Sequence, residues 1–285
     1  MSGRISEQAV LFGNWTSLVG IVTKAVPPAS ADCPAIVILN TGIIHRVGHH
    51  RMFVTMSRAL AAVGYTVLRF DFSGIGDSSP RNDGLSLVDA RMAEIKEALD
   101  WLERECTASR MILIGLCSGA DHAVLYGHTD PRIAGLVLMD PSISPTFRYY
   151  LHYIARRLQQ LRSWFNVLSG RSHTLRMLMR HMLRTVQLGK AQRYPPQNLV
   201  PRQIIERHYQ NSVDRGIEIL AIFTEETTRQ TYREQMIEAL PNVSFGDRLK
   251  LEFFRGSDHT FGLESDRSRL IQLILQWVST VSKTA

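Results

Sequence analysis

The sequence predicts an α/β protein built on a mostly parallel sheet that helices flank on both faces. Short apolar runs alternate along the chain with amphipathic segments of helical period, a pattern typical of strands joined by crossover helices. The length of 285 residues and the hydrophobic content of 45% suit one large domain. Because ligands bind at the carboxyl ends of the strands in such sheets, we expect the site in the loops that follow them.

Each predicted element has its own local signal. Loose alternation over residues 9–24 predicts an antiparallel hairpin at the sheet edge. Continuous apolar runs predict buried strands, and apolar residues at helical spacing predict helices. The further strands are expected at 35–39, 65–70, 111–114, 133–139, 217–223 and 249–254, and the helices at 51–63, 85–102, from a glycine-rich turn to about 126, near 230–240 and at 265–281.

One turn organises the rest of the sequence. The apolar run 111–114 leads directly into Gly115-Leu116-Cys117-Ser118-Gly119, and a helical pattern follows. Glycines on both sides of a sharp strand-to-helix turn avoid collisions, and such a turn presents its central residue as a nucleophile. We interpret Cys117 as that nucleophile. The alternatives are a buried Cys between glycines that only pack, and Ser118 as nucleophile, which lies one place too late.

The same turn predicts part of an oxyanion hole. The amide of Ser118 would face the carbonyl under attack, and the positive end of the following helix would favour a thiolate at Cys117. The second donor is expected in the loop after Leu39, at Gly42 or Ile43, because glycine lets the backbone approach closely.

Short motifs at the ends of the predicted strands match one known pattern, and these motifs are Asn40-Thr41-Gly42, His45-Arg46-Val47-Gly48, Arg69-Phe70-Asp71, Gly74-Ile75-Gly76-Asp77-Ser78, Gly115 to Ala120 and Gly256 to Phe261. In them the chain resembles the α/β-hydrolase fold. It is most similar to serine-aminopeptidase-like hydrolases associated with the exosortase system, and to hydrolases that accompany polyketide and nonribosomal peptide assembly lines. The resemblance covers about residues 35–140 and 217–280. It implies ester or thioester chemistry without fixing a substrate.

The resemblance implies a base after the last strand, where His259 stands. A Cys nucleophile needs a base because a free thiol, with a pKa of ~8.5, is mostly protonated at neutral pH. A carboxylate should orient the imidazole, but the Asp that the resemblance implies after Phe223 is missing. Glu226 is the first candidate, Glu225 the second and Asp140 the third. A solvated pair of Glu residues and a Cys–His pair without an acid are the alternatives.

Two polar loops near the predicted site have structural interpretations. Asp71 and Asp77 belong to a glycine-containing loop whose spacing fits no cation site, so we expect it to brace the turn at Cys117. His45, Arg46 and the run His49-His50-Arg51 could meet an anionic group, but a solvated loop is the preferred interpretation. No metal or cofactor is expected.

Residues 141–215 are strongly basic, with 13 Lys and Arg against two acidic residues, a net charge of +11. The α/β-hydrolase fold inserts its lid at this place, so we expect a core of 1–140 and 216–285 and a helical lid at 141–215. Tyr150, Tyr153, Met179 and Met182 stand at helical spacing there and could line an acyl pocket, or could only pack together.

The basic lid favours an acidic acyl carrier protein or a CoA thioester as partner. A peripheral contact with an anionic membrane is an alternative, and no motif for nucleic-acid binding is found. Three Cys without a CxxC pair argue against a disulfide scaffold or a zinc site, and favour the cytoplasm. No signal peptide and no membrane span of about 18 apolar residues are expected.

Together these observations predict an acyl-transfer hydrolase, meaning a thioesterase, esterase or acyltransferase, that acts through Cys117, His259 and a carboxylate. Two alternatives stay open: a non-catalytic homologue that binds a ligand or a carrier protein, and a membrane-surface lipid esterase.

Overall fold

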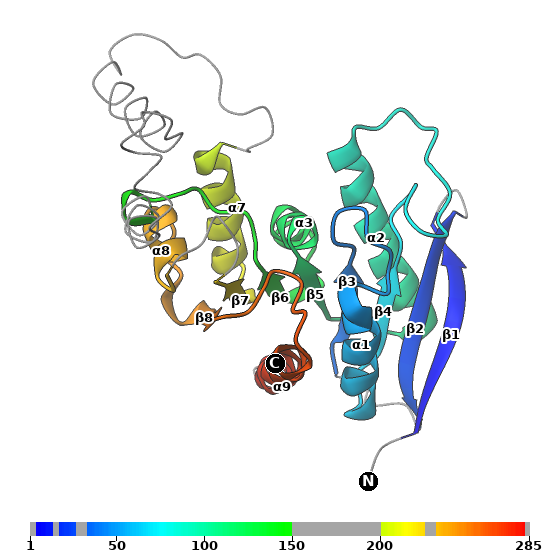
Figure 1. The fold of residues 1–285 in the computed structure, drawn as a ribbon. Coiled ribbons are helices and arrows are strands. Elements are labelled where there is room, and N and C mark those ends of the chain that lie inside the picture. Colours follow the sequence, from blue (N-terminus) through cyan, green and yellow to red (C-terminus); the bar gives the residue numbers. More distant parts are fainter. Residues whose placement is uncertain (1–3, 14–16, 27–32, 150–200, 226–231, 283–285) are drawn as a thin grey trace, which may run out of the picture.

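The computed structural model describes residues 4–13, 17–26, 33–149, 201–225 and 232–282. These residues contain an eight-stranded sheet in the order β1-β2-β4-β3-β5-β6-β7-β8 (Figure 1). The neighbours from β4 to β8 pair in parallel, while β1 and β2 are antiparallel at one edge. The predicted fold class, a mostly parallel sheet flanked by helices, is confirmed. The strands are β1 (Arg4–Phe12), β2 (Leu18–Val26), β3 (Ala35–Leu39), β4 (Val67–Phe70), β5 (Met111–Leu116), β6 (Ile133–Met139), β7 (Glu218–Thr224) and β8 (Leu249–Phe254).

Helices cover both faces of the sheet, as strand β3 illustrates. Ala35, Val37 and Leu39 belong to one hydrophobic core, and Ile36 and Ile38 belong to the other. The first core lies under α2, α3, α7 and α8, and the second under α1 and α9 (Figure 1). The helices are α1 (Met52–Ala62), α2 (Leu87–Cys106), α3 (Ser118–Gly127), α7 (Arg202–Asp214), α8 (Gln235–Ala239) and α9 (Glu264–Val281).

Most predicted boundaries agree with the structure to within a few residues, and local hydrogen bonds explain the differences. The side chain of Ser86 accepts a hydrogen bond from the amide of Asp89, so α2 begins at Leu87 rather than at 85. The amide of Tyr65 donates to the carbonyl of Leu60 in the turn that ends α1, so β4 begins two residues later than predicted.

The last part of the predicted lid packs on the core. Helix α7 lies against α3, and Tyr209 of α7 is buried within the first hydrophobic core. Residues 150–200, which make up most of the predicted lid, lie outside the described residues. The lid at 141–215 therefore stays a prediction, and its final helix shares the core of the sheet.

Candidate active site

Cys117 lies in a sharp turn between β5 and α3. Its φ of 55° and ψ of −119° are unusual for a residue with a side chain. The turn leaves no room for side chains beside it. A Cβ on Gly115 would lie 2.2 Å from the carbonyl carbon of Gly119, and one on Gly119 would lie 2.6 Å from the carbonyl oxygen of Asn40. Cys117 is partly exposed although all of β5 is buried, so the turn brings its side chain out of the core.

His259 lies beside Cys117, in the loop between β8 and α9. Its Nδ1 is 2.8 Å from Oδ2 of Asp140, and its ring also forms a hydrogen bond with the side chain of Cys117. Because Nδ1 faces the carboxylate, Nε2 is the nitrogen available to the sulfur. The three side chains thus form a continuous line of hydrogen bonds at the carboxyl end of the sheet.

Asp140 is fixed between two strand ends. It follows β6, its side chain is almost fully buried, and its φ is 45°. Thr224, at the end of β7, donates its amide to Oδ1 at 2.8 Å and its hydroxyl to Oδ2 at 2.7 Å. Sequence reasoning missed this role of Thr224, because a threonine at the end of an apolar strand carries no signal of its own.

The surroundings of His259 favour its protonated form. The hydrogen bond to Asp140, followed by the one to Cys117, raises the pKa of His259 from 6.5 to about 10, although burial opposes the rise. The imidazole therefore keeps its proton at neutral pH. A protonated imidazole beside a cysteine is an arrangement in which cysteine enzymes hold their nucleophile as a thiolate.

The two loops predicted to supply the oxyanion hole come together. Ser118 is the first residue of α3, where backbone amides have no partner within the helix. The amide of Gly42 donates to Oγ of Ser118 at 2.7 Å, and Gly42 has a φ of 53°. The side chain of Ile43, the next residue, is exposed. The role of these residues as oxyanion donors stays a prediction.

A buried carboxylate holds the loop that contains Gly42. Asp71 is fully buried and accepts hydrogen bonds from the Asn40 side chain at 3.3 Å, from the Arg46 amide at 2.5 Å and from the Arg46 guanidinium. Arg46 also pairs with Asp77 at 2.5 Å. This network braces the backbone opposite the turn at Cys117. Arg46 is engaged by carboxylates of the chain itself.

A family model described as alpha/beta hydrolase fold matches residues 35–221. The chain belongs to the α/β hydrolase family. An esterase from Pyrococcus furiosus is 13% identical, covers 97% of this chain and 91% of its own, and gives a TM-score of 0.61. A serine hydrolase homologue from Coxiella burnetii is 14% identical, covers 94% of this chain and 96% of its own, and gives a TM-score of 0.57. A proline iminopeptidase from Mycobacterium smegmatis is 14% identical, covers 97% of this chain and 99% of its own, and gives a TM-score of 0.56. At these identities the similarity shows the fold alone. No curated protein sequence gives a significant match.

In this α/β hydrolase, the carboxylate bonded to His259 is Asp140, the third of the three sequence candidates. Glu226, the first candidate, lies outside the described residues. Glu225, the second, accepts a hydrogen bond at 2.9 Å from a backbone amide that follows β8. Asp258, the neighbour of His259, accepts hydrogen bonds from amides of its own loop.

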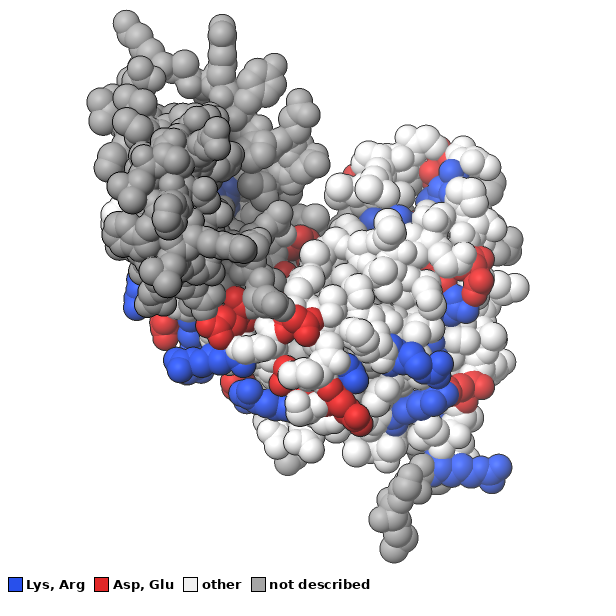
Figure 2. Space-filling model, in the orientation of Figure 1, with Lys and Arg blue, Asp and Glu red and all other residues white. Residues whose placement is uncertain are grey.

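The surface around the site is described only in part. Tyr150, Tyr153, Met179 and Met182, the predicted lid residues, lie outside the described residues. On the face seen in Figure 2, the basic and acidic side chains of the described residues are interspersed. Within the described residues, no helix is long and apolar enough to cross a membrane, and no group of three or more His, Cys, Asp or Glu could hold a metal ion.

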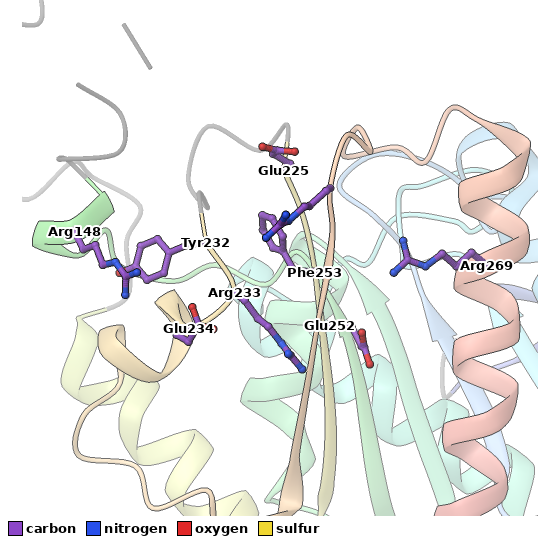
Figure 3. A pocket seen from close by; sticks show the side chains of 9 residues that line it. Arg148, Glu225, Tyr232, Arg233, Glu234, Glu252, Phe253 and Arg269 are labelled. Carbon is purple, nitrogen blue, oxygen red and sulfur yellow. The ribbon is translucent and has the colours of Figure 1, made fainter. Parts of the chain in front are cut away.

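A separate cavity of about 730 Å³ lies beside the edge strand β8 (Figure 3). Four arginines and three glutamates line it, together with Tyr232 and Phe253, and neither Cys117 nor His259 does. The Arg233 guanidinium in this cavity donates to the carbonyl of Leu251 at 2.7 Å. It thereby covers a polar group on the edge of the sheet, where an uncovered strand would invite pairing with another chain.

The substitution Gly119→Ala should disrupt the turn. Its Cβ would press on the carbonyl of Asn40, so the helix and the loop must separate, and we expect the free energy of unfolding to fall by about 1–3 kcal/mol. Urea unfolding measures the change. Gly84→Asn is the control, because Gly84 has a φ of 72° with nothing near its Cβ position, and Asn tolerates that conformation. Equal losses in the two variants would contradict the packing argument.

The pH dependence of stability should report the pKa of His259. Because the pKa is raised on folding, from 6.5 to about 10, the protonated ring stabilises the folded chain fully below pH 6.5. This stabilisation should then decline as the pH rises toward 10. Urea unfolding at about pH 6, 8 and 10 gives the free energy of unfolding of the wild-type protein and of His259→Gln. The difference between these two free energies measures the contribution of the protonated ring. A difference that stays constant, or grows with pH, would contradict the raised pKa.

Proposed function

We propose that this α/β hydrolase transfers an acyl group from an ester or thioester to Cys117, and then to water or to another nucleophile. The observation that carries the proposal is the line of hydrogen bonds from Cys117 through His259 to Asp140. Acyl transfer needs a nucleophile, a proton carrier within hydrogen-bond reach of it, and a group that orients the carrier. Here Cys117 follows β5, Asp140 follows β6, and His259 lies in the loop after β8.

The first half of the proposed reaction forms an acyl-enzyme. The thiolate of Cys117 attacks the carbonyl carbon, and the carbonyl electron pair moves onto oxygen. The amide of Ser118 would hold the resulting oxyanion, together with a second donor where the loop of Gly42 meets Ser118. When the intermediate collapses, the bond to the leaving alcohol or thiol breaks, and the leaving group takes the proton of His259. Asp140 stays ionised and orients the ring throughout.

The second half releases the acyl group. The now neutral His259 takes a proton from an incoming water, whose oxygen attacks the thioester carbonyl of the acyl-enzyme. Collapse of the second intermediate expels the sulfur of Cys117 as a thiolate, and the protonated His259 is restored. An amine or alcohol could take the place of water, because the acyl-enzyme is itself a thioester.

The proposed substrate class is an acyl thioester on a carrier protein or on CoA. The charge of +11 over residues 141–215 supports it, because a strongly basic segment would attract an acidic partner. The alternative of a non-catalytic homologue was favoured by the apparent lack of an acid. The bond from His259 to Asp140 supports the catalytic interpretation over this alternative.

Cys117 should carry the acyl group. After exposure to a panel of acyl thioesters, intact-mass spectrometry should detect an adduct on the wild-type protein and none on Cys117→Ala, while Ser118→Ala should still form one. Iodoacetamide should label Cys117 faster than Cys33 and Cys106. All three thiols are partly exposed, so exposure alone would predict similar rates. An adduct that maps to Ser118, or equal labelling of the three thiols, would contradict the proposal.

Asp140→Asn should lower kcat/KM for acyl thioesters by about 10²–10⁴-fold, because an amide at this place favours the wrong tautomer of His259. Steady-state kinetics with one thioester measures the loss. Glu225→Gln is the matched control, since it removes the charge of the second sequence candidate without touching the bond between Asp140 and His259. A larger loss in the Glu225 variant than in the Asp140 variant would assign the acid to Glu225.

A further inference from the structure

The hydroxyl of Ser118 occupies a special position next to the proposed nucleophile. Its Oγ accepts the hydrogen bond of the Gly42 amide at 2.7 Å. A hydroxyl that accepts one hydrogen bond still has its own proton to donate. Among the described residues, no acceptor for that proton is found. Gly42 itself faces open space, because nothing lies within 4 Å of a Cβ placed on it.

This hydrogen bond changes the role of the amide that the loop after β3 offers. The Gly42 amide is the expected second donor of the oxyanion hole, but its hydrogen already points at Ser118. The loop has little freedom to turn the Gly42 amide elsewhere. Asp71 accepts hydrogen bonds from the Asn40 side chain, before Gly42 in the chain, and from the Arg46 amide, after it. An oxyanion beside Cys117 would therefore meet the Ser118 hydroxyl next to the Ser118 amide.

We propose that the side chain of Ser118 is a donor of the oxyanion hole, held in place by the Gly42 amide. The Gly42 amide fixes Oγ, and the Ser118 hydroxyl proton binds the oxygen of the tetrahedral intermediate. The inference rests on the proposed function, since it needs an acyl carbonyl under attack by Cys117. It adds a catalytic side chain to a hole whose other donor is the backbone amide of Ser118.

The physical basis is a chain of two hydrogen bonds. A hydroxyl that accepts from an amide becomes a better donor, because successive hydrogen bonds polarise one another. The oxygen of the intermediate carries a full negative charge and the substrate carbonyl does not, so the bond strengthens as the reaction proceeds. Removing one such donor typically lowers kcat by about 10²–10³-fold.

If the Gly42 amide rather than the Ser118 hydroxyl were the donor, Ser118→Ala would have the opposite effect on the acylation rate. If the Gly42 amide bound the oxyanion directly, the Ser118 hydroxyl would compete for the same hydrogen. Its removal would then leave the acylation rate unchanged or raise it. The direction of the effect in Ser118→Ala therefore separates the two arrangements.

The experiment compares two reactions of the same sulfur in wild type, Ser118→Ala and Ser118→Thr. Acylation by a short acyl thioester passes through an oxyanion, whereas alkylation by iodoacetamide displaces iodide at a saturated carbon and forms none. Single-turnover acylation, followed by mass spectrometry, should fall by about 10²–10³-fold in Ser118→Ala. Alkylation of Cys117 should stay within about twofold, and Ser118→Thr, which keeps the hydroxyl, should retain most of the acylation rate.

Each other outcome has a definite meaning. Acylation of Ser118→Ala at or above the wild-type rate overturns the inference while leaving Cys117 as nucleophile. Equal losses of acylation and alkylation also overturn it, because the side chain then acts on the sulfur rather than on the oxyanion. Ser118→Gly lacks the hydroxyl as well and gives the same comparison if the Ala variant does not fold. A wild-type protein that forms no adduct on Cys117 overturns the proposed function itself.

Discussion

The carboxylate of Asp140 is the group on which the arrangement of the site depends. A buried carboxylate is strongly destabilising unless hydrogen bonds compensate for the lost water, and Asp140 receives them from Thr224 and from His259. These donors come from the end of β7 and from the loop after β8, so one charge joins three strand ends. The amide of Cys117 donates to the carbonyl of Met139, the residue before Asp140, and this bond ties the sharp turn to the same point.

The site also concentrates backbone conformations that most residues avoid. Cys117 and Asp140 both have positive φ values although neither is glycine, and Gly42, in the loop that contacts Ser118, also has a positive φ. Such conformations persist only where the surrounding structure determines them. Here β5 and β6 are almost wholly buried, and the close approach of Gly119 to Asn40 leaves the turn no alternative path. The rigid core thus holds the sulfur, the ring and the carboxylate at fixed positions.

The sequence predicts those parts of this arrangement that depend on neighbours along the chain. Strands β3 and β6 have the predicted bounds because each is a continuous apolar run that ends at a polar residue. Strand β8 has them because its apolar residues alternate with Lys250 and Glu252 and end at Arg255. The glycines two residues to either side of Cys117 likewise predict its sharp turn. The sequence places Asp140 only third among the candidates to contact His259, because this contact depends on distant segments. Asp140 and Thr224 are 84 residues apart, and the pairing of β6 with β7 and of β7 with β8 brings the carboxylate, the threonine and the ring together.

The raised pKa of His259 bears on which leaving group this site can expel. Two groups raise that pKa, the carboxylate of Asp140 and the side chain of Cys117. In the proposed reaction, acylation of the sulfur removes its interaction with the ring, so one of the two causes of the raised pKa disappears and His259 gives up its proton more readily as the new bond forms. A thiol leaving group, with a pKa of ~8.5, needs that proton far less than an alcohol does. Within the proposed reaction, a proton held this tightly before the attack favours thioesters over esters of alcohols as substrates.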